Sequence, residues 1–118
     1  MKRSVALEII DDIRNQLIEK YKPEKIILFG SSAWGEGDIN DIDLFIVKRD
    51  VPHYGADRVT ELYRMTDVEA AVDFVVYKPE EAEEGLSLGD PFIKKIYKEG
   101  KVLYGRSEDC SGMAGQGG

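Results

Sequence analysis

The stretch "FGSSAWGEGDINDIDLFIV", residues 29–47, joins the end of one apolar run to the start of another through a turn rich in glycine and acids. The runs "KIILF", residues 25–29, and "IDLFIV", residues 42–47, are short, apolar and rich in β-branched residues, so they predict two buried strands. Gly30 and Ser31 follow the first strand directly, which predicts a sharp turn into a short helix. The backbone amides and the hydroxyl of such a turn can bind phosphate oxygens.

Acidic residues stand where the second strand begins. Asp41 and Asp43 are two positions apart, so both side chains project from the same face. They could belong to a solvated turn or to a metal site, because two close carboxylates repel each other unless a cation neutralises them. Asp73 interrupts a third predicted strand, "AVDFVVY", residues 71–77. If the two strands are neighbours, the three acids together can hold one or two Mg²⁺ ions for phosphoryl or nucleotidyl transfer.

The rest of the chain alternates between helical and extended patterns. Apolar residues at helical spacing predict a first helix over residues 4–20 with Ser4 as its cap. Further predicted elements are a helix over 56–65, a short acidic helix or turn over 78–85, a helix over 90–100 with Asp90, Pro91 and Gly100 as its boundary residues, and a last strand over 101–104. The order of elements indicates the α/β (α+β) class, with a small mixed sheet of three to four strands flanked by helices.

Composition limits the kinds of function. The 118 residues suffice for one domain, and one cysteine with one histidine exclude zinc-type clusters and favour oxygen ligands. The net charge of −7 disfavours direct nucleic-acid binding and suits a basic protein partner. No apolar run approaches the roughly 20 residues that span a bilayer, and the amphipathic N-terminal stretch is unlike a signal peptide. We therefore expect a cytoplasmic protein.

The motifs described above resemble those of a known superfamily. "GSSAWGEGDINDID", residues 30–43, resembles the Gly-Ser and Asp-x-Asp signature of the DNA polymerase beta-like nucleotidyltransferase superfamily. The similarity extends to "VDFVVY" and "FIKKIYKEGKVLYG", and the whole looks like the minimal nucleotidyltransferase (MNT) family. The resemblance implies a polymerase beta-like fold with a nucleotidyltransferase domain over residues 1–105. Residues 106–118 lack apolar periodicity and predict a disordered tail.

The resemblance also implies roles for individual residues. Gly30 and Ser31 would contact the triphosphate of ATP, while Asp41, Asp43 and Asp73 would be the catalytic carboxylates and the ligands of two Mg²⁺ ions.

The chain departs from the family pattern at two positions. Trp34 stands where arginine is frequent, and Asn40 stands where serine is frequent. Trp34 could stack on a base or pack under the turn, and we favour packing.

The resemblance implies a function as well. Minimal nucleotidyltransferases often pair with a helical HEPN-type RNase toxin and neutralise it by moving AMP from ATP to a tyrosine of the toxin. We therefore expect an antitoxin that is a protein adenylyltransferase, working in a homo- or hetero-oligomer. The alternatives are an antitoxin that acts by contact alone, and a transferase that modifies a small hydroxylated molecule.

Overall fold

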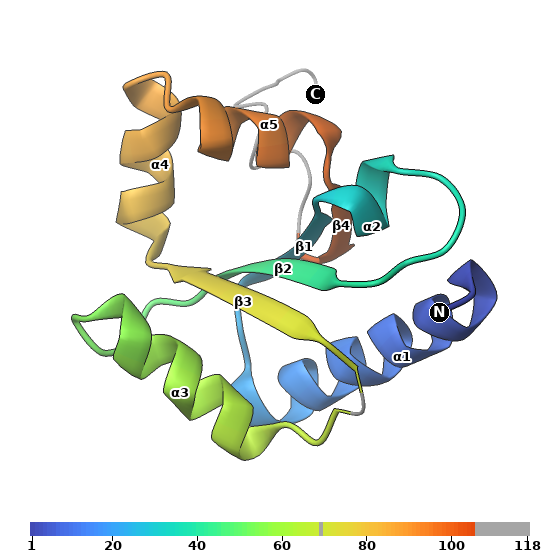
Figure 1. Cartoon of the computed structure of the whole chain (residues 1–118). Coiled ribbons are helices and arrows are strands. Elements are labelled where there is room, and N and C mark those ends of the chain that lie inside the picture. The colour runs from blue at the N-terminus through green and yellow to red at the C-terminus, as the bar shows by residue number, and fades with distance from the viewer. Residues whose placement is uncertain (69, 106–118) are drawn as a thin grey trace.

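The computed structural model describes residues 1–68 and 70–105, so the tail predicted for residues 106–118 lies outside the described residues. As predicted, the chain is an α+β protein built on a mixed four-stranded sheet with helices on both faces (Figure 1). Its elements in chain order are α1 (Arg3–Gln16), η1 (Leu17–Tyr21), β1 (Lys25–Phe29), α2 (Ser31–Trp34), β2 (Ile42–Val47), α3 (Gly55–Met65), β3 (Val72–Tyr77), α4 (Pro79–Ser87), α5 (Pro91–Glu99) and β4 (Lys101–Tyr104).

The sheet places the second and third strands next to each other, as the acid-site hypothesis requires. The strand order is β3-β2-β1-β4, with β2 and β3 parallel and β1 antiparallel to both of its neighbours. Helix α3 makes the crossover between the two parallel strands. Both parallel strands therefore start at the same edge of the sheet, and residues at their first positions meet there.

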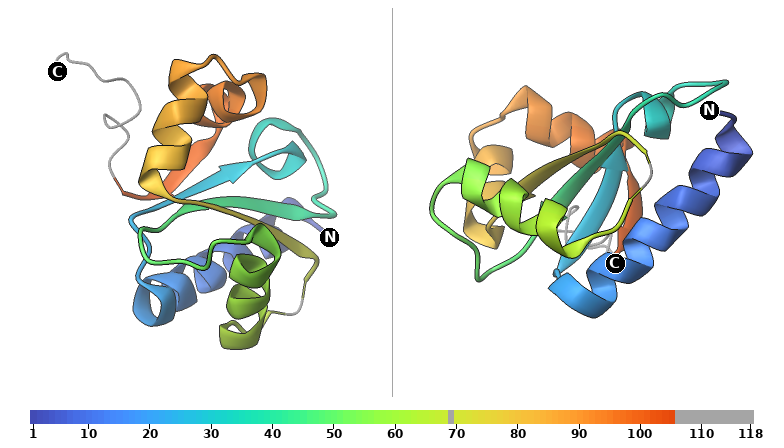
Figure 2. Two further views of the ribbon diagram at one scale, coloured as in Figure 1. Left: turned by 90° about the vertical axis from the view of Figure 1, so that its left-hand side faces the viewer. Right: turned by 60° about the horizontal axis from the view of Figure 1, so that its bottom comes forward.

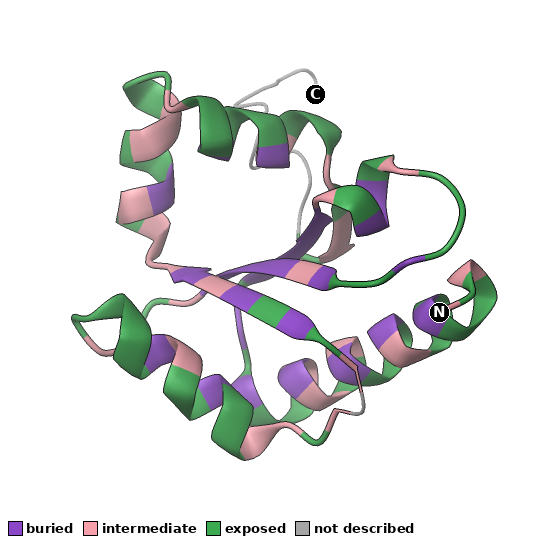
Figure 3. Cartoon of the chain, viewed as in Figure 1, coloured by how far each residue is buried: buried purple, intermediate pink, exposed green. Residues whose placement is uncertain are grey.

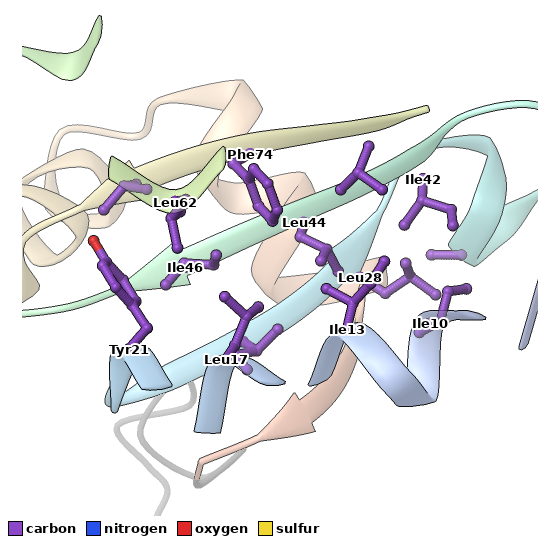
Figure 4. Packing of buried hydrophobic residues seen from close by; sticks show 14 of the residues in the cluster. Ile10, Ile13, Leu17, Tyr21, Leu28, Ile42, Leu44, Ile46, Leu62 and Phe74 are labelled. Atoms are coloured by element: carbon purple, nitrogen blue, oxygen red, sulfur yellow. The ribbon is translucent and has the colours of Figure 1, made fainter. Parts of the chain in front are cut away.

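Each face of the sheet has its own hydrophobic core. On one face, α1, η1 and α3 pack against alternate residues of the strands, with Ile13, Leu17 and Leu44 fully enclosed (Figure 4). On the other face, α4 and α5 cover a smaller cluster that includes Phe45, Ile93 and Ile96. Figure 2 shows these two helical layers on opposite sides of the sheet. None of the helices within the described residues combines the length and apolar character needed to cross a membrane.

The first helix differs from its prediction at both ends. It begins at Arg3, its cap position is Lys2, and Ser4 lies inside the helix, so the prediction of Ser4 as the cap is wrong. At the other end, the last turn widens into the π-helical segment η1. Lys22 then leaves the right-handed region with φ 56° and ψ 57°, a left-handed conformation, whereas a following proline by itself favours extended backbone.

The last two helices agree with the sequence. The acidic segment forms the full helix α4, and α5 begins at Pro91 with the Asp90 carboxylate accepting a hydrogen bond from the backbone N–H of Phe92 at 2.9 Å. Gly100 follows its end and leads directly into β4. This chain of short connections fixes α5 over β1, beside the turn that follows that strand.

Candidate functional site

Two of the three predicted acids are direct neighbours. Asp43 on β2 and Asp73 on β3 are paired in the parallel register, so their side chains leave the same face of the sheet. Asp43 shares that face with Phe45 and Val47, which belong to the smaller core under α4 and α5. The two carboxylates therefore stand at the end of an otherwise apolar row, and Figure 3 shows the exposed and half-buried bands that interrupt the buried sheet there.

The third predicted acid, Asp41, lies outside the strand. It directly precedes β2 and is exposed, whereas Asp43 is half-buried. Within the described residues, no three histidine, cysteine, aspartate or glutamate side chains are arranged to hold a metal ion as they stand. A full three-carboxylate metal site therefore stays a prediction.

The electrostatics of the pair favour a bound positive charge. Partial burial raises the pKa of Asp43, the negative charges of Asp73 and Asp41 raise it further, and a hydrogen bond between the Asp43 and Asp73 side chains adds to the effect. A raised pKa means that the ionised carboxylate is unfavourable in this position. A proton or a cation relieves this cost, and hard divalent cations prefer oxygen ligands of this kind. The Asp43–Asp73 pair thus fits Mg²⁺.

The Gly-Ser turn lies against the acid pair. Gly30 adopts φ 74°, and a Cβ added there would overlap Oδ2 of Asp43 and lie 3.1 Å from its Cγ. A side chain at this position would therefore both strain the backbone and displace the carboxylate. The predicted phosphate-contacting turn and the predicted metal ligand are thus in immediate contact.

The two serines of the turn have different surroundings. Ser32 is buried, and its hydroxyl donates a hydrogen bond to the Phe29 carbonyl at 3.0 Å, which closes the turn. Ser31 is exposed at the start of α2. The Ser31 hydroxyl, which is predicted to contact phosphate, therefore lies at the surface, whereas the Ser32 hydroxyl is buried.

The sequence did not predict a set of hydrogen bonds from Arg3 that holds the loop between the Gly-Ser turn and the acids. The guanidinium of Arg3 donates hydrogen bonds to the carbonyls of Gly37 at 3.1 Å, Gly35 at 3.0 Å and Ser32 at 3.4 Å. The backbone N–H of Ile39 also donates to the Met1 carbonyl at 2.9 Å. Met1 and Arg3 thus hold residues 32–39, which lead to Asp41. No local sequence motif around Arg3 indicates this role.

Trp34 lies at the end of the short helix that follows the turn, and the favoured interpretation that it packs under the turn stays a prediction. It is 37% exposed at the end of α2, and the Lys95 Nζ of α5 lies 4.7 Å from the centre of its ring. The indole is therefore partly open to solvent beside the Gly-Ser turn, with an ammonium group over its face.

A second feature without a sequence signal is the buried Arg58. Its guanidinium forms an ion pair with Glu81 at 2.8 Å and donates to the carbonyls of Pro52, His53 and Val76. These contacts join the loop before α3, the strand β3 and the helix α4, so they brace the strand that carries Asp73.

Comparison with known proteins agrees with the fold. The profile of the family described as polymerase beta, nucleotidyltransferase matches residues 11–109. A crystal structure of a proposed nucleotidyltransferase from Sulfolobus solfataricus has a similar fold, with a TM-score of 0.60, 18% identity and 92% coverage of each chain. No curated protein matches the chain.

Proposed function

The chain belongs to the polymerase beta nucleotidyltransferase family, and we propose that it transfers AMP from ATP to a hydroxyl group of a partner protein. The observation that carries the proposal is the contact between Gly30 and the Asp43 carboxylate, with Asp73 paired to Asp43 across the parallel strands. A phosphate-binding turn and a pair of metal-binding acids are the two parts that nucleotidyl transfer needs in one place.

Each part has a distinct chemical role. The backbone at Gly30 and the Ser31 hydroxyl would bind oxygens of the triphosphate. Asp41, Asp43 and Asp73 would hold Mg²⁺, which neutralises negative charge on the triphosphate and on the departing pyrophosphate. The exposed carboxylate of Asp73 would accept the proton of the acceptor hydroxyl. The hydroxyl oxygen then bonds to the α-phosphorus, the bond between the α-phosphate and the β-phosphate breaks, and pyrophosphate leaves.

The proposed partner is a HEPN-type helical toxin, and AMP transfer to its tyrosine would make this chain the antitoxin. The support is the resemblance to minimal nucleotidyltransferases together with a net charge of −7, which suits a basic ribonuclease. A cytoplasmic location follows from this role.

A contact-only antitoxin is the competing function. It needs only surface contact, for which the net charge of −7 suits a basic partner. The two functions differ in one observable, which is covalent modification of the partner.

The test uses the purified chain, a purified HEPN-type protein encoded beside it, Mg²⁺ and ATP labelled on either the α- or the γ-phosphate. We expect the α label on the partner and the γ label in released pyrophosphate. Asp43→Asn should abolish labelling, while Asp50→Asn, a change at an exposed acid after β2, should not. Neutralisation of the toxin without any label would establish the contact-only function instead, and transfer of the γ label would indicate a different reaction.

A further inference from the structure

Two large aromatic side chains remain open to solvent around the Gly-Ser turn. Phe92, in the first turn of α5, is 44% exposed, and Trp34, at the end of α2, is 37% exposed. Isolated exposed aromatics are common, but exposed aromatics that flank one turn can provide a stacking surface. Neither ring takes part in the metal or triphosphate roles assigned above.

Phe92 is connected to the acid pair through one intervening ring. Phe29 lies directly opposite Asp43 in the antiparallel register of β1 and β2, so the two side chains share a face with Cβ atoms about 5 Å apart. The rings of Phe29 and Phe92 meet edge to face, with centroids 5.7 Å apart and planes at 88°. The part of Phe92 that does not touch Phe29 is therefore separated from the acids by the Phe29 ring alone. The backbone of Phe92 is held by its hydrogen bond to the Asp90 cap.

Lys95 connects Phe92 to Trp34. It follows Phe92 by three positions in the helix, so the two side chains lie on one helical face. Its ammonium group lies over the Trp34 ring, at 4.7 Å from the centroid. Trp34 in turn follows Ser31 within the same four-residue helix. Strand register, one ring contact, helical spacing and one cation–π contact thus link the acids, through Phe29 and Phe92, to Lys95 and Trp34 beside the turn.

We propose that Phe92, Trp34 and Lys95 form the nucleoside subsite of this transferase. The purine base stacks on the exposed face of Phe92 with Trp34 at its side, and Lys95 adds positive charge for the phosphates bound at the turn. A cation is needed there because the neighbouring acids and the net charge of −7 repel a polyanion. The inference rests on the proposed function, since it assigns the base of the same nucleotide.

The chain contains one tryptophan, so Trp34 is an intrinsic fluorescent probe of this subsite. We would titrate the full chain with Mg²⁺ and a non-hydrolysable α,β-methylene ATP, and separately with Mg²⁺ and inorganic tripolyphosphate. Equilibrium dialysis of the same ligands gives affinities that do not depend on the fluorescence. The analogue should change Trp34 emission, and Phe92→Ala should weaken its binding about tenfold, as expected for the loss of one stacked base.

The two ligands separate stacking from charge. Phe92→Ala should leave tripolyphosphate binding unchanged, whereas Lys95→Met should weaken the binding of both ligands. Phe92→Tyr should keep the wild-type affinity for the analogue because it keeps an aromatic ring. Phe92→Leu, which keeps apolar packing on Phe29 but has no ring, should bind the analogue more weakly. Lys94→Met is the matched control, because Lys94 is exposed on α5 but lies two positions from Phe92, on a different part of the helix.

Failure of this inference differs from failure of the proposed function. If the analogue binds with equal affinity to wild type and Phe92→Ala, or if Phe92→Leu binds as well as wild type, the subsite assignment is wrong and nucleotidyl transfer still stands. If wild type binds neither the analogue nor tripolyphosphate, both the subsite and the proposed function are wrong.

Discussion

Replacing Asp43 by asparagine should make the protein more stable at neutral pH while it removes transfer activity. The folded state holds Asp43 half-buried beside Asp73, and the pKa of Asp43 is raised by that burial and by the two neighbouring acids. An amide of the same shape carries no charge, and its NH₂ group can donate a hydrogen bond to Asp73. The substitution therefore removes a repulsion that a bound cation or a proton would otherwise relieve.

The magnitude follows from the pairing of the two strands. Cross-strand pairs of side chains are worth roughly 0.2–1 kcal/mol, and we take the repulsion between these two acids to be of that size. For a domain of this size, such a gain corresponds to a rise in Tm of about 1–6 °C. The comparison is made in EDTA, so that no divalent cation offsets the repulsion in the wild type.

The pH dependence has a definite sign. Because the pKa of Asp43 is higher in the folded state than in the unfolded state, the folded protein binds the proton more tightly. The wild type therefore loses stability as the pH rises from the unfolded pKa through the folded pKa. The advantage of Asp43→Asn should be complete above that window and absent below it, where both forms are neutral at this position.

The assay is thermal unfolding followed by circular dichroism from pH 3 to pH 8, with Asp50→Asn as the control. Added Mg²⁺ should raise the Tm of the wild type and have a smaller effect on Asp43→Asn, because a ligand that binds only the folded state stabilises it. A variant that is less stable than the wild type at pH 7, or equally favoured at pH 3 and pH 7, would refute the electrostatic account of the pair.

Three further predictions concern the supports of the site. Gly30→Ala should lower stability by about 1–2 kcal/mol in chemical denaturation and lower activity, because its Cβ would be strained at φ 74° and would displace Asp43. Glu81→Gln should lower the free energy of unfolding by about 1 kcal/mol at pH 7 in the same assay, a figure discounted for the 41% exposure of the Glu81 side chain. The hydrogen bond from Arg58 lowers the pKa of Glu81, so the stability lost in the variant should shrink as the pH falls through that pKa. Arg3→Ala should speed proteolysis within residues 35–41, seen by mass spectrometry, and Arg3→Lys should not restore protection because the three carbonyl contacts need the guanidinium fork.

Local patterns predicted the elements of the fold well. The strands, the Gly-Ser turn and the boundaries of α5 all follow from short-range rules, namely strand propensity, glycine after a strand, and the Asp90–Pro91 and Gly100 signals. The hypothesis that Asp43 and Asp73 are neighbours was conditional on strand order, and the parallel register of β2 and β3 confirms that condition.

Contacts between distant residues could not be predicted in the same way. Arg3 and Arg58 act through hydrogen bonds to backbone carbonyls, and every residue type supplies a carbonyl, so the sequence carries no signal of the acceptor. Ser4 failed as a cap for a related reason. The capping position depends on where the backbone enters the helix, and here Arg3 is already the first helical residue, with tertiary hydrogen bonds of Arg3 and Met1 beside it.

Manganese binding tests the central claim most directly, because Mn²⁺ replaces Mg²⁺ at oxygen sites and is visible by electron paramagnetic resonance. The measurement titrates Mn²⁺ into the wild type, Asp43→Asn, Asp73→Asn and Asp50→Asn, each with α,β-methylene ATP present. We predict that wild type and Asp50→Asn bind Mn²⁺ together with the nucleotide. Either change in the acid pair should lower the Mn²⁺ affinity at least about tenfold, because even the loss of a residue that only supports a metal ligand costs about that much. Equal Mn²⁺ binding by all four proteins would contradict the assignment of Asp43 and Asp73 as the metal-binding centre.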